Sequence, residues 1–425
     1  MLRRRHFLLL TAGIACRRPA AMDSIAERYV KLVLALGKHD ADYVDAYYGP
    51  PEWKTGPPLS LDQIRAEGAA LTGALEAAPP APGREELKRL RHRYLLVQTK
   101  AVIARAEMLA GKVYSFYEEC RALYDAVAPP ANPSQFERTV AEIDKLVPGR
   151  GPLAQRYAVW RKQFELPAQR LAEVFKVAID EARARTARTI ALPAGENFAV
   201  EYVSKQVWSA YNWYKGNSQS LIQVNTDLPV EANFALRLAC HEGYPGHHVY
   251  NALLEDRLVR KRGWVEYCVY PLYSPRSLIA EGSADYGLEL AFPPEDRAEF
   301  LAKKIFPLAG LDAGKVPAYL QVIALTDTLD HATNYAARRY VDKEISRQEC
   351  QRLLEKYVLQ APDRAEQRVR FIDKNRGYVI NYNVGEDLIR EHMKARGAAG
   401  SGPEAWREFE RLLSSPRLPS GLSRA

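Results

Sequence analysis

Apolar residues recur at intervals of three and four between Ser24 and Arg188, and this spacing predicts helices rather than strands. Ser60-Leu61-Asp62-Gln63 has the form of a capping box, so a helix should begin there. Residues 84–127 contain no proline and one glycine, and their apolar positions recur at three and four, which predicts a long helical segment. Another helix should start at Asn132-Pro133, with proline in its first turn. We therefore expect residues 22–190 to form an N-terminal helical region.

The pattern changes to alternation between Phe198 and Asn225, where β-branched and aromatic residues are frequent. Alternate residues of a strand face the same side, so Tyr211 and Trp213 should lie on one face. Lys215-Gly216-Asn217 should turn the chain, and residues 220–224 should return as the next strand. This stretch predicts a small antiparallel sheet.

The helical pattern resumes over Val230–Glu242 and continues to about residue 395. Further helices are predicted at residues 277–290, 318–340, 347–359 and 379–395. The residues from Ser415 are rich in proline, serine and arginine, so we expect residues 415–425 to form a mobile tail. The predicted fold class is mainly α (α+β), with residues 191–414 as a second region that contains the sheet.

The composition is that of a soluble globular protein and argues against nucleic acid as the main partner. The chain of 425 residues is 47% hydrophobic and 26% charged. Its formal net charge is +8, which falls to +5 when Arg3, Arg4 and Arg5 of the N-terminal segment are set aside. So small a charge does not predict the basic footprint of a nucleic-acid-binding surface.

Residues 1–21 predict a bacterial export signal, because a basic patch precedes a short apolar run and small residues. Arg4-Arg5 resembles the twin-arginine type of signal. Gly13-Ile14-Ala15-Cys16 resembles a lipoprotein cleavage site, although the leucine usual three residues before the cysteine is missing. Simple cleavage near Ala20-Ala21 is the alternative. We expect an exported protein, either periplasmic or attached to the membrane through a lipidated Cys16.

The remaining cysteines do not predict a zinc ribbon, because none of them shows Cys-x-x-Cys spacing. They are Cys120, Cys240, Cys268 and Cys350. Buried free thiols and one or two disulfides both remain open for them.

Chemistry-bearing residues concentrate in the segment His241-Glu242-Gly243-Tyr244-Pro245-Gly246-His247-His248, which holds three of the eight histidines. Imidazoles can hold zinc, and the adjacent Glu242 can act as a base towards its water. The spacing departs from His-Glu-x-x-His, in which the two imidazoles lie one helical turn apart. In a straight helix, His247 would rise about 9 Å and rotate about 240° from His241, so the two could not share a metal.

The same segment contains a helix break at the required position. Pro245 lies four residues after His241, so it cannot donate the helical hydrogen bond to the His241 carbonyl and would clash with it. Gly246 then permits the backbone to turn back. If two of the residues between His241 and His247 bulge out of the helix, His247 takes the place that a four-residue spacing gives to the second histidine ligand. We therefore favour His247 as ligand, with His248 as an alternative ligand or a group that hydrogen-bonds substrate.

Glu281 is the best candidate for a third protein ligand, in an apolar stretch that predicts a helix. Asp285 follows four residues later and shares its helical face. An aspartate in that place could accept the second N–H of a histidine ligand and so orient it. Glu242 would then be the general base. The alternative is a structural histidine cluster at a helix end beside a solvated acidic face.

His241–His248 and Glu281-Gly282 resemble the domain of unknown function 885 family, bacterial proteins with a His-Glu-x-x-Pro-Gly-His-His motif. The resemblance covers roughly Trp213 to Arg390, including Tyr382-Asn383-Val384-Gly385. That family is similar to the gluzincin zinc peptidases. The resemblance therefore implies a mostly helical fold around two motif helices, a bound Zn²⁺ ion and hydrolysis of peptides. This chain is shorter than is common in that family, and the family's Asp-x-Gly-x-His segment is not recognisable near Asp342–Ile345.

A peptidase of this kind also needs a donor that stabilises the oxyanion of the transition state. Tyr382 is the first candidate, followed by Tyr378 and His331, although each could be purely structural. An extended peptide could pair with the edge of the predicted sheet. Tyr43–Trp53 has four aromatic residues beside a Gly-Pro-Pro turn, which could line a cleft or fasten a surface loop.

These observations favour an exported, mainly helical zinc metallopeptidase that acts on peptides. Two rival hypotheses remain: a zinc hydrolase of another amide or ester, such as a cell-wall fragment, and a non-enzymatic exported binding protein with a relic site. The presence of Glu242 argues against the relic, because a purely structural zinc site does not need that carboxylate.

Overall fold

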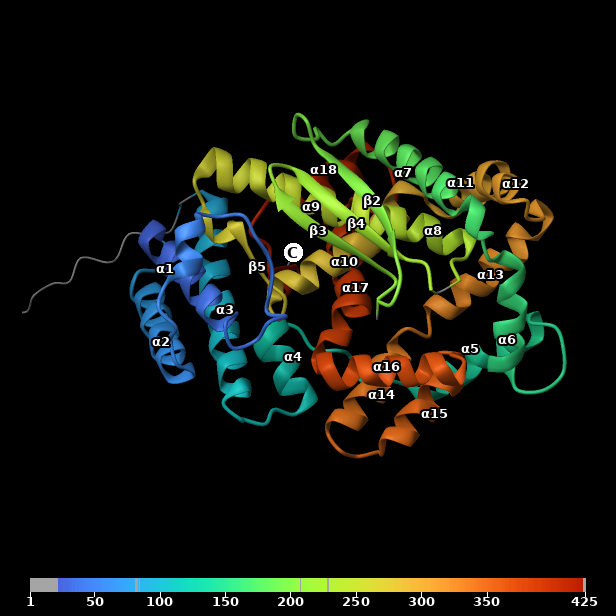
Figure 1. Ribbon diagram of the computed structural model, residues 1–425, viewed down its shortest axis with the longest axis horizontal. Coiled ribbons are helices and arrows are strands. Elements are labelled where there is room, and N and C mark those ends of the chain that lie inside the picture. The colour runs from blue at the N-terminus through green and yellow to red at the C-terminus, as the bar shows by residue number, and fades with distance from the viewer. Residues whose placement is uncertain (1–21, 81–82, 84, 207, 228, 423–425) are drawn as a thin grey trace, which may run out of the picture.

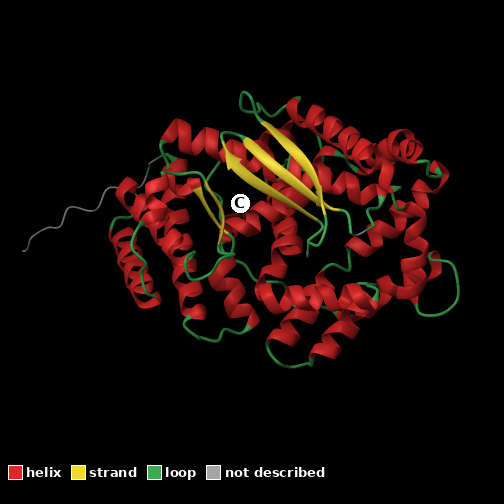
Figure 2. Ribbon diagram, viewed as in Figure 1, coloured by secondary structure: helices red, strands yellow, loops and turns green. Residues whose placement is uncertain are grey.

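Helices account for most of the chain, which confirms the mainly α prediction (Figure 2). The computed structural model describes residues 22–80, 83, 85–206, 208–227 and 229–422. The export signal predicted for residues 1–21, with Cys16, lies outside the described residues. Within the described part of the chain, no helix is both long and apolar enough to cross a membrane.

Between residues 22 and 190 the described chain is mostly helical, as its apolar spacing predicts (Figure 1). Its helices are α1 (Met22–Leu36), α2 (Leu61–Ala77), α3 (Glu86–Leu109), α4 (Phe116–Tyr124), α5 (Pro133–Leu146), α6 (Leu153–Arg161) and α7 (Leu171–Ala187). The capping box that begins α2 is confirmed: the Ser60 hydroxyl accepts from the Gln63 N–H, and the Gln63 side chain accepts from the Ser60 N–H.

The long helical segment predicted over residues 84–127 is divided into α3 and α4 by a turn. Gly111 lies in the turn with φ of +97°, a left-handed conformation that glycine adopts without strain. Ser115 then forms a second capping box with Glu118 and starts α4. Helical spacing thus continues across the break, while a local glycine and a cap decide where the helix ends.

A three-stranded sheet follows, in the order β2–β4–β3. Its strands are β2 (Asn197–Val203), β3 (Ala210–Gly216) and β4 (Gln219–Asn225). The predicted hairpin is confirmed, because β3 and β4 are antiparallel, but β2 pairs with β4 in parallel. The hairpin turns at Asn217 and Ser218, which have φ values of +55° and +54°, one residue later than predicted.

The histidine motif lies on helices that the sheet covers, and a second pair of helices crosses beside them (Figure 1). The motif elements are α8 (Ala232–Leu238), the π-helical segment η4 (Ala239–Gly243) and α9 (His247–Leu254); the crossing pair is α10 (Pro275–Ala291) and α17 (Ile380–Ala395). A Cβ on Gly282 would lie 2.2 Å from the Gly385 carbonyl carbon, so these two glycines permit the close crossing.

The remaining elements complete a helical shell around the motif. The strands are β1 (Val44–Tyr47) and β5 (Val269–Pro271), which pair antiparallel. The helices are α11 (Pro294–Phe300), α12 (Phe306–Ala309), α13 (Val316–Asp327), α14 (His331–Val341), α15 (Arg347–Tyr357), α16 (Pro362–Asn375), α18 (Pro403–Leu413) and α19 (Pro419–Leu422). Short 3₁₀ segments are η1 (Pro51–Thr55), η2 (Lys162–Phe164), η3 (Ala168–Arg170), η6 (Val265–Cys268), η8 (Ala313–Lys315) and η9 (Arg376–Val379), and further π-helical segments are η5 (Glu255–Arg260) and η7 (Leu301–Ile305).

Two expectations for this half of the chain differ from the structure. The helix predicted over residues 318–340 is divided into α13 and α14 by a turn. Residues 415–422, the described part of the expected mobile tail, pack against the body: Leu418 and Leu422 are buried, and the Ser420 N–H donates to Asp125 at 3.0 Å. The apolar residues of this short segment are enough to hold it.

Large hydrophobic clusters join the two predicted regions rather than separating them. One cluster packs Phe175 of α7 with Leu236 of α8 and Ile279 of α10. Another packs Leu95 of α3 with Ile380 of α17. Both clusters contain residues from each side of residue 190, and helices from both sides support the motif.

Candidate metal centre

The helix break predicted at Pro245 lies where expected, and a π-helical turn precedes it. The Tyr244 N–H donates to the Ala239 carbonyl at 3.2 Å, and the Gly246 N–H donates to the Cys240 carbonyl at 3.0 Å. A Cβ on Gly246 would lie 1.9 Å from the His241 carbonyl oxygen, so only glycine fits this fold-back. The π turn is a feature that the sequence pattern did not predict.

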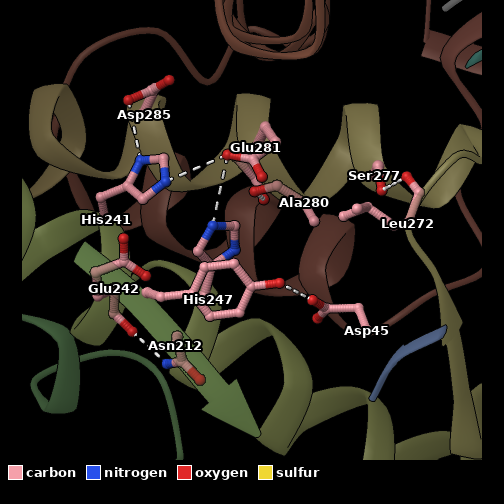
Figure 3. A network of polar contacts seen from close by, with 12 residues as sticks. Asp45, Asn212, His241, Glu242, His247, Leu272, Ser277, Ala280, Glu281 and Asp285 are labelled. Atoms are coloured by element: carbon pink, nitrogen blue, oxygen red, sulfur yellow. Dashed lines mark hydrogen bonds and ion pairs between the residues drawn. The ribbon is translucent and has the colours of Figure 1, made fainter. Parts of the chain in front are cut away.

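The fold-back brings the two motif imidazoles face to edge. The His241 and His247 ring centroids are 4.6 Å apart, with an interplanar angle of 89°. Oε2 of Glu281, from α10, lies 3.3 Å from His241 Nε2 and 3.6 Å from His247 Nε2 (Figure 3). One ligand atom from each of these residues falls within 4.8 Å of the others. The cluster is buried, apart from a partly exposed His247.

Hydrogen bonds fix the orientation of two members of this cluster. His241 Nδ1–H donates to Asp285 Oδ1 at 3.0 Å, which leaves the lone pair of Nε2 directed at the cluster. Arg237 Nη2 donates to the same oxygen at 2.9 Å. The Tyr378 hydroxyl donates to Glu281 Oε1 at 2.8 Å, which leaves Oε2 for the imidazoles. Asp285 thus lies where its spacing from Glu281 predicts.

Burial and nearby charges shift the pKa values of Glu281 and Glu242 in opposite directions. Burial would raise the pKa of Glu281, but the neighbouring His247 and His241 lower it well below its usual range. Burial raises the pKa of Glu242, which the same imidazoles only partly offset. The Asn212 side chain donates to the Glu242 carbonyl at 2.7 Å and ties β3 to the motif. Glu242 is therefore a buried carboxyl beside the cluster that is easier to protonate than an ordinary glutamate.

His248 lies outside the cluster, in a separate buried network. Its Nε2–H donates to Glu196 Oε2 at 2.9 Å, and its Nδ1 accepts from the Ser220 hydroxyl at 2.9 Å. Arg183 donates to the other Glu196 oxygen at 2.6 Å. The pKa of Glu196 is lowered: burial opposes the shift, and the hydrogen bonds from His248, Tyr244 and Arg183 outweigh it. Sequence reasoning missed Glu196, which no motif marks.

The three candidates for the oxyanion donor have different surroundings. Tyr378 uses its hydroxyl on Glu281. Tyr382 lies beside it, with ring centroids 5.9 Å apart, and its pKa is raised by burial and by the charge of Glu281. His331 is paired with Asp387 at 2.8 Å. Tyr382 is close enough to the cluster for the charges of Glu281 and Glu242 to act on its hydroxyl, while the hydrogen bond to Glu281 comes from Tyr378.

Asp45, from β1, is a residue near the cluster that the motif analysis did not single out (Figure 3). Its carboxylate accepts a hydrogen bond from the Tyr211 hydroxyl. Burial raises its pKa to about 6, while the Tyr211 hydrogen bond and the charge of His247 act against that rise. The aromatic segment around Asp45, for which a cleft lining and a surface staple were both open, thus brings a carboxylate close to the metal cluster.

The four described cysteines, Cys120, Cys240, Cys268 and Cys350, are buried free thiols. None of them belongs to the metal cluster.

The overall fold is shared with a candidate lipoprotein from Colwellia psychrerythraea, at a TM-score of 0.52 and 13% identity. The alignment covers 86% of this chain and 63% of that one, so this chain spans less than two thirds of its neighbour's length. An M32 carboxypeptidase from Deinococcus radiodurans R1 aligns at a TM-score of 0.40 and 15% identity, over 92% of this chain and 87% of that one. The first likeness shows the fold alone, and the second is too weak to support an argument.

No family model and no curated protein matches the sequence. The resemblance to the domain of unknown function 885 family therefore continues to depend on the motif residues themselves.

Proposed function

We propose that this protein is a zinc-dependent peptidase, with His241, His247 and Glu281 as the zinc ligands. The observation that carries the proposal is their convergence from η4, α9 and α10, with ligand atoms within 4.8 Å of one another. Zinc bonds of about 2.0–2.1 Å in a tetrahedron imply ligand atoms about 3.3 Å apart. The distances of 3.3 and 3.6 Å from Glu281 to the two imidazoles suit that geometry.

Three protein ligands are the number that catalytic zinc sites use, since a fourth position stays open to water or substrate. When bound, zinc would polarise the scissile carbonyl and lower the pKa of a coordinated water. Glu242 would take the proton of the attacking water and pass it to the leaving amine. Its raised pKa suits both steps, because it brings the carboxyl closer to the pH at which the protein works.

Tyr382 is the proposed donor to the oxyanion. The Tyr378 hydroxyl is already committed to Glu281, which favours Tyr382 for this task. Its phenol would remain protonated at neutral pH, because burial and the Glu281 charge raise its pKa. The proposed substrate is a peptide that pairs in extended form with an edge of the sheet, a mode of binding in which the backbone supplies the hydrogen bonds. Neither the charge nor the site chemistry favours nucleic acid.

Zinc content and peptide hydrolysis test the proposal together. Purified protein should carry about one zinc per chain and cleave members of a mixed peptide library. Glu242→Gln should keep the zinc and lose hydrolysis by roughly 10²–10⁴-fold, the usual contribution of a general base. Glu289→Gln is the matched control, because that carboxylate pairs with Arg390 on the surface of α10. Absence of stoichiometric zinc from the native protein would refute the proposal.

A parallel digest of murein fragments separates the peptidase from a zinc hydrolase of another amide. If murein fragments are cleaved and the peptide library is not, the substrate assignment is wrong while the zinc chemistry stands.

We also propose that the protein is exported and anchored through a lipidated Cys16. The signal-like composition of residues 1–21 supports this, and the fold neighbour is itself named as a candidate lipoprotein. Labelling with a palmitate analogue should mark the wild type and not Cys16→Ser. An unlabelled wild type in the periplasmic fraction would leave export standing and refute lipidation.

A further inference from the structure

The strand β1 lies along β3, and the two are bridged by side chains rather than by backbone pairing. The Tyr211 hydroxyl of β3 donates to the Asp45 carboxylate of β1. Further along, the Tyr48 and Tyr214 rings meet edge to face, with centroids 5.3 Å apart. A Cβ on Gly216 would lie 2.8 Å from the Tyr48 Cβ, so the chain is closely packed there. The edge of β3 is therefore covered from Tyr211 onwards.

The segment Asp45–Tyr48, which covers β3, is held in place by hydrogen bonds. The Tyr48 N–H donates to the Cys268 carbonyl at 3.0 Å, and the Tyr48 hydroxyl donates to the Tyr267 carbonyl at 2.7 Å. The strand β1 also pairs with β5. A peptide bound at the metal cluster therefore cannot continue between β1 and β3, and its chain must end beside Asp45 and Tyr211.

The charge at this closed end is negative. Among the residues that the structure describes, no cation forms an ion pair with Asp45. The charge of Arg276 acts on Asp45, but Arg276 is fully buried and directs its N–H groups to the Val269 carbonyl, at 2.9 Å, and to Asn251, at 3.0 Å. His247 and Glu281 also face Asp45.

We propose that Asp45 binds the α-ammonium group of the substrate, so that the protein removes residues from the amino-terminal end of peptides. This inference depends on the proposed peptidase function and adds a polarity to it. A closed end requires a chain terminus there, and an unpaired carboxylate selects the terminus that is positive. A carboxyl terminus in the same place would put two like charges together in a half-buried site. Asp45 is therefore a specificity-determining residue.

The test uses one pair of internally quenched peptides that carry a C-terminal amide and differ only in a free or acetylated amino terminus. The wild type should cleave the free-amine peptide with kcat/KM at least about tenfold higher, as expected for a hydrogen bond between charged groups. Asp45→Asn keeps an oxygen for Tyr211 and removes the charge. It should abolish the preference, mainly by raising KM for the free-amine peptide. Asp42→Asn, on the exposed part of the same segment beside Lys374, should retain the preference.

Equal cleavage of both peptides by the wild type overturns the inference, and so does an equal loss for both in Asp45→Asn. Because the wild-type comparison needs no variant, a misfolded Asp45→Asn does not prevent a decision. Calorimetric titration of the same two peptides into Glu242→Gln gives a readout without turnover. Tighter binding of the free amine by at least about tenfold supports the Asp45 subsite even if neither peptide is hydrolysed, whereas equal affinity refutes it. Failure of hydrolysis with preserved amine selectivity would count against the proposed function alone.

Discussion

The hydrogen bond between His241 and Asp285 permits a quantitative test of how the site is assembled. Asp285→Asn keeps the size of the side chain and removes its charge. Asp285 Oδ1 lies 3.0 Å from His241 Nδ1, and its side chain is only 3% exposed. The substitution should weaken the orientation of His241 and the electron donation to its ring. Loss of such an orienting partner commonly costs 10–100-fold in metal affinity, which corresponds to about 1.4–2.7 kcal/mol.

The measurement is a competition titration of zinc against a chromophoric chelator at pH 7.5, with thermal unfolding recorded on the same samples. Arg237 would lose an ionic partner in Asp285→Asn, but its side chain is 31% exposed and water can replace part of that contact. We therefore expect a larger change in zinc affinity than in the stability of the metal-free protein. Glu289→Gln, one turn further along α10, should leave zinc affinity unchanged. Affinity within twofold of wild type in Asp285→Asn would refute the orienting role.

Three further outcomes are expected. His247→Ala should lose stoichiometric zinc on dialysis, whereas His248→Ala should keep it. The second variant should instead lose about 1–3 kcal/mol of unfolding free energy, because buried Glu196 and Ser220 lose a partner. Zinc retained by the first variant and lost by the second would reverse the assignment. Gly282→Ala should destabilise the fold by about 1–3 kcal/mol or more in chemical denaturation, because its Cβ would lie 2.2 Å from the α17 backbone. Its control, Gly73→Ala, meets nothing within 4 Å and should stabilise α2 by about 0.5–1 kcal/mol. The pKa of Glu196 in the folded protein lies below the ordinary value of a glutamate. The stability that Glu196 contributes is therefore present above the ordinary pKa and is lost as the pH falls. Glu196→Gln should flatten the rise in stability between about pH 3 and 5, and an unchanged slope would contradict this.

Local features of the chain could be predicted from the sequence because their causes are local. The cap at Ser60 and the helix break at Pro245 each depend on a few consecutive residues, and both occur where predicted. The shared face of Glu281 and Asp285 follows from helical spacing alone. The end of α3 was missed, although Gly111 was visible, because helical spacing continues beyond it.

Choices that depend on distant partners were settled only by the tertiary structure. His247 and His248 are adjacent and chemically identical, and the partners of His248, Glu196 and Ser220, lie 52 and 28 residues away in the chain. No spacing rule connects residues that far apart. Asp45 likewise reaches the cluster because β1 packs beside β3. The sequence by itself determined which residue types could hold a metal and where the motif helix must break, whereas packing between distant segments decided which imidazole faces the cluster and which carboxylate closes the sheet edge.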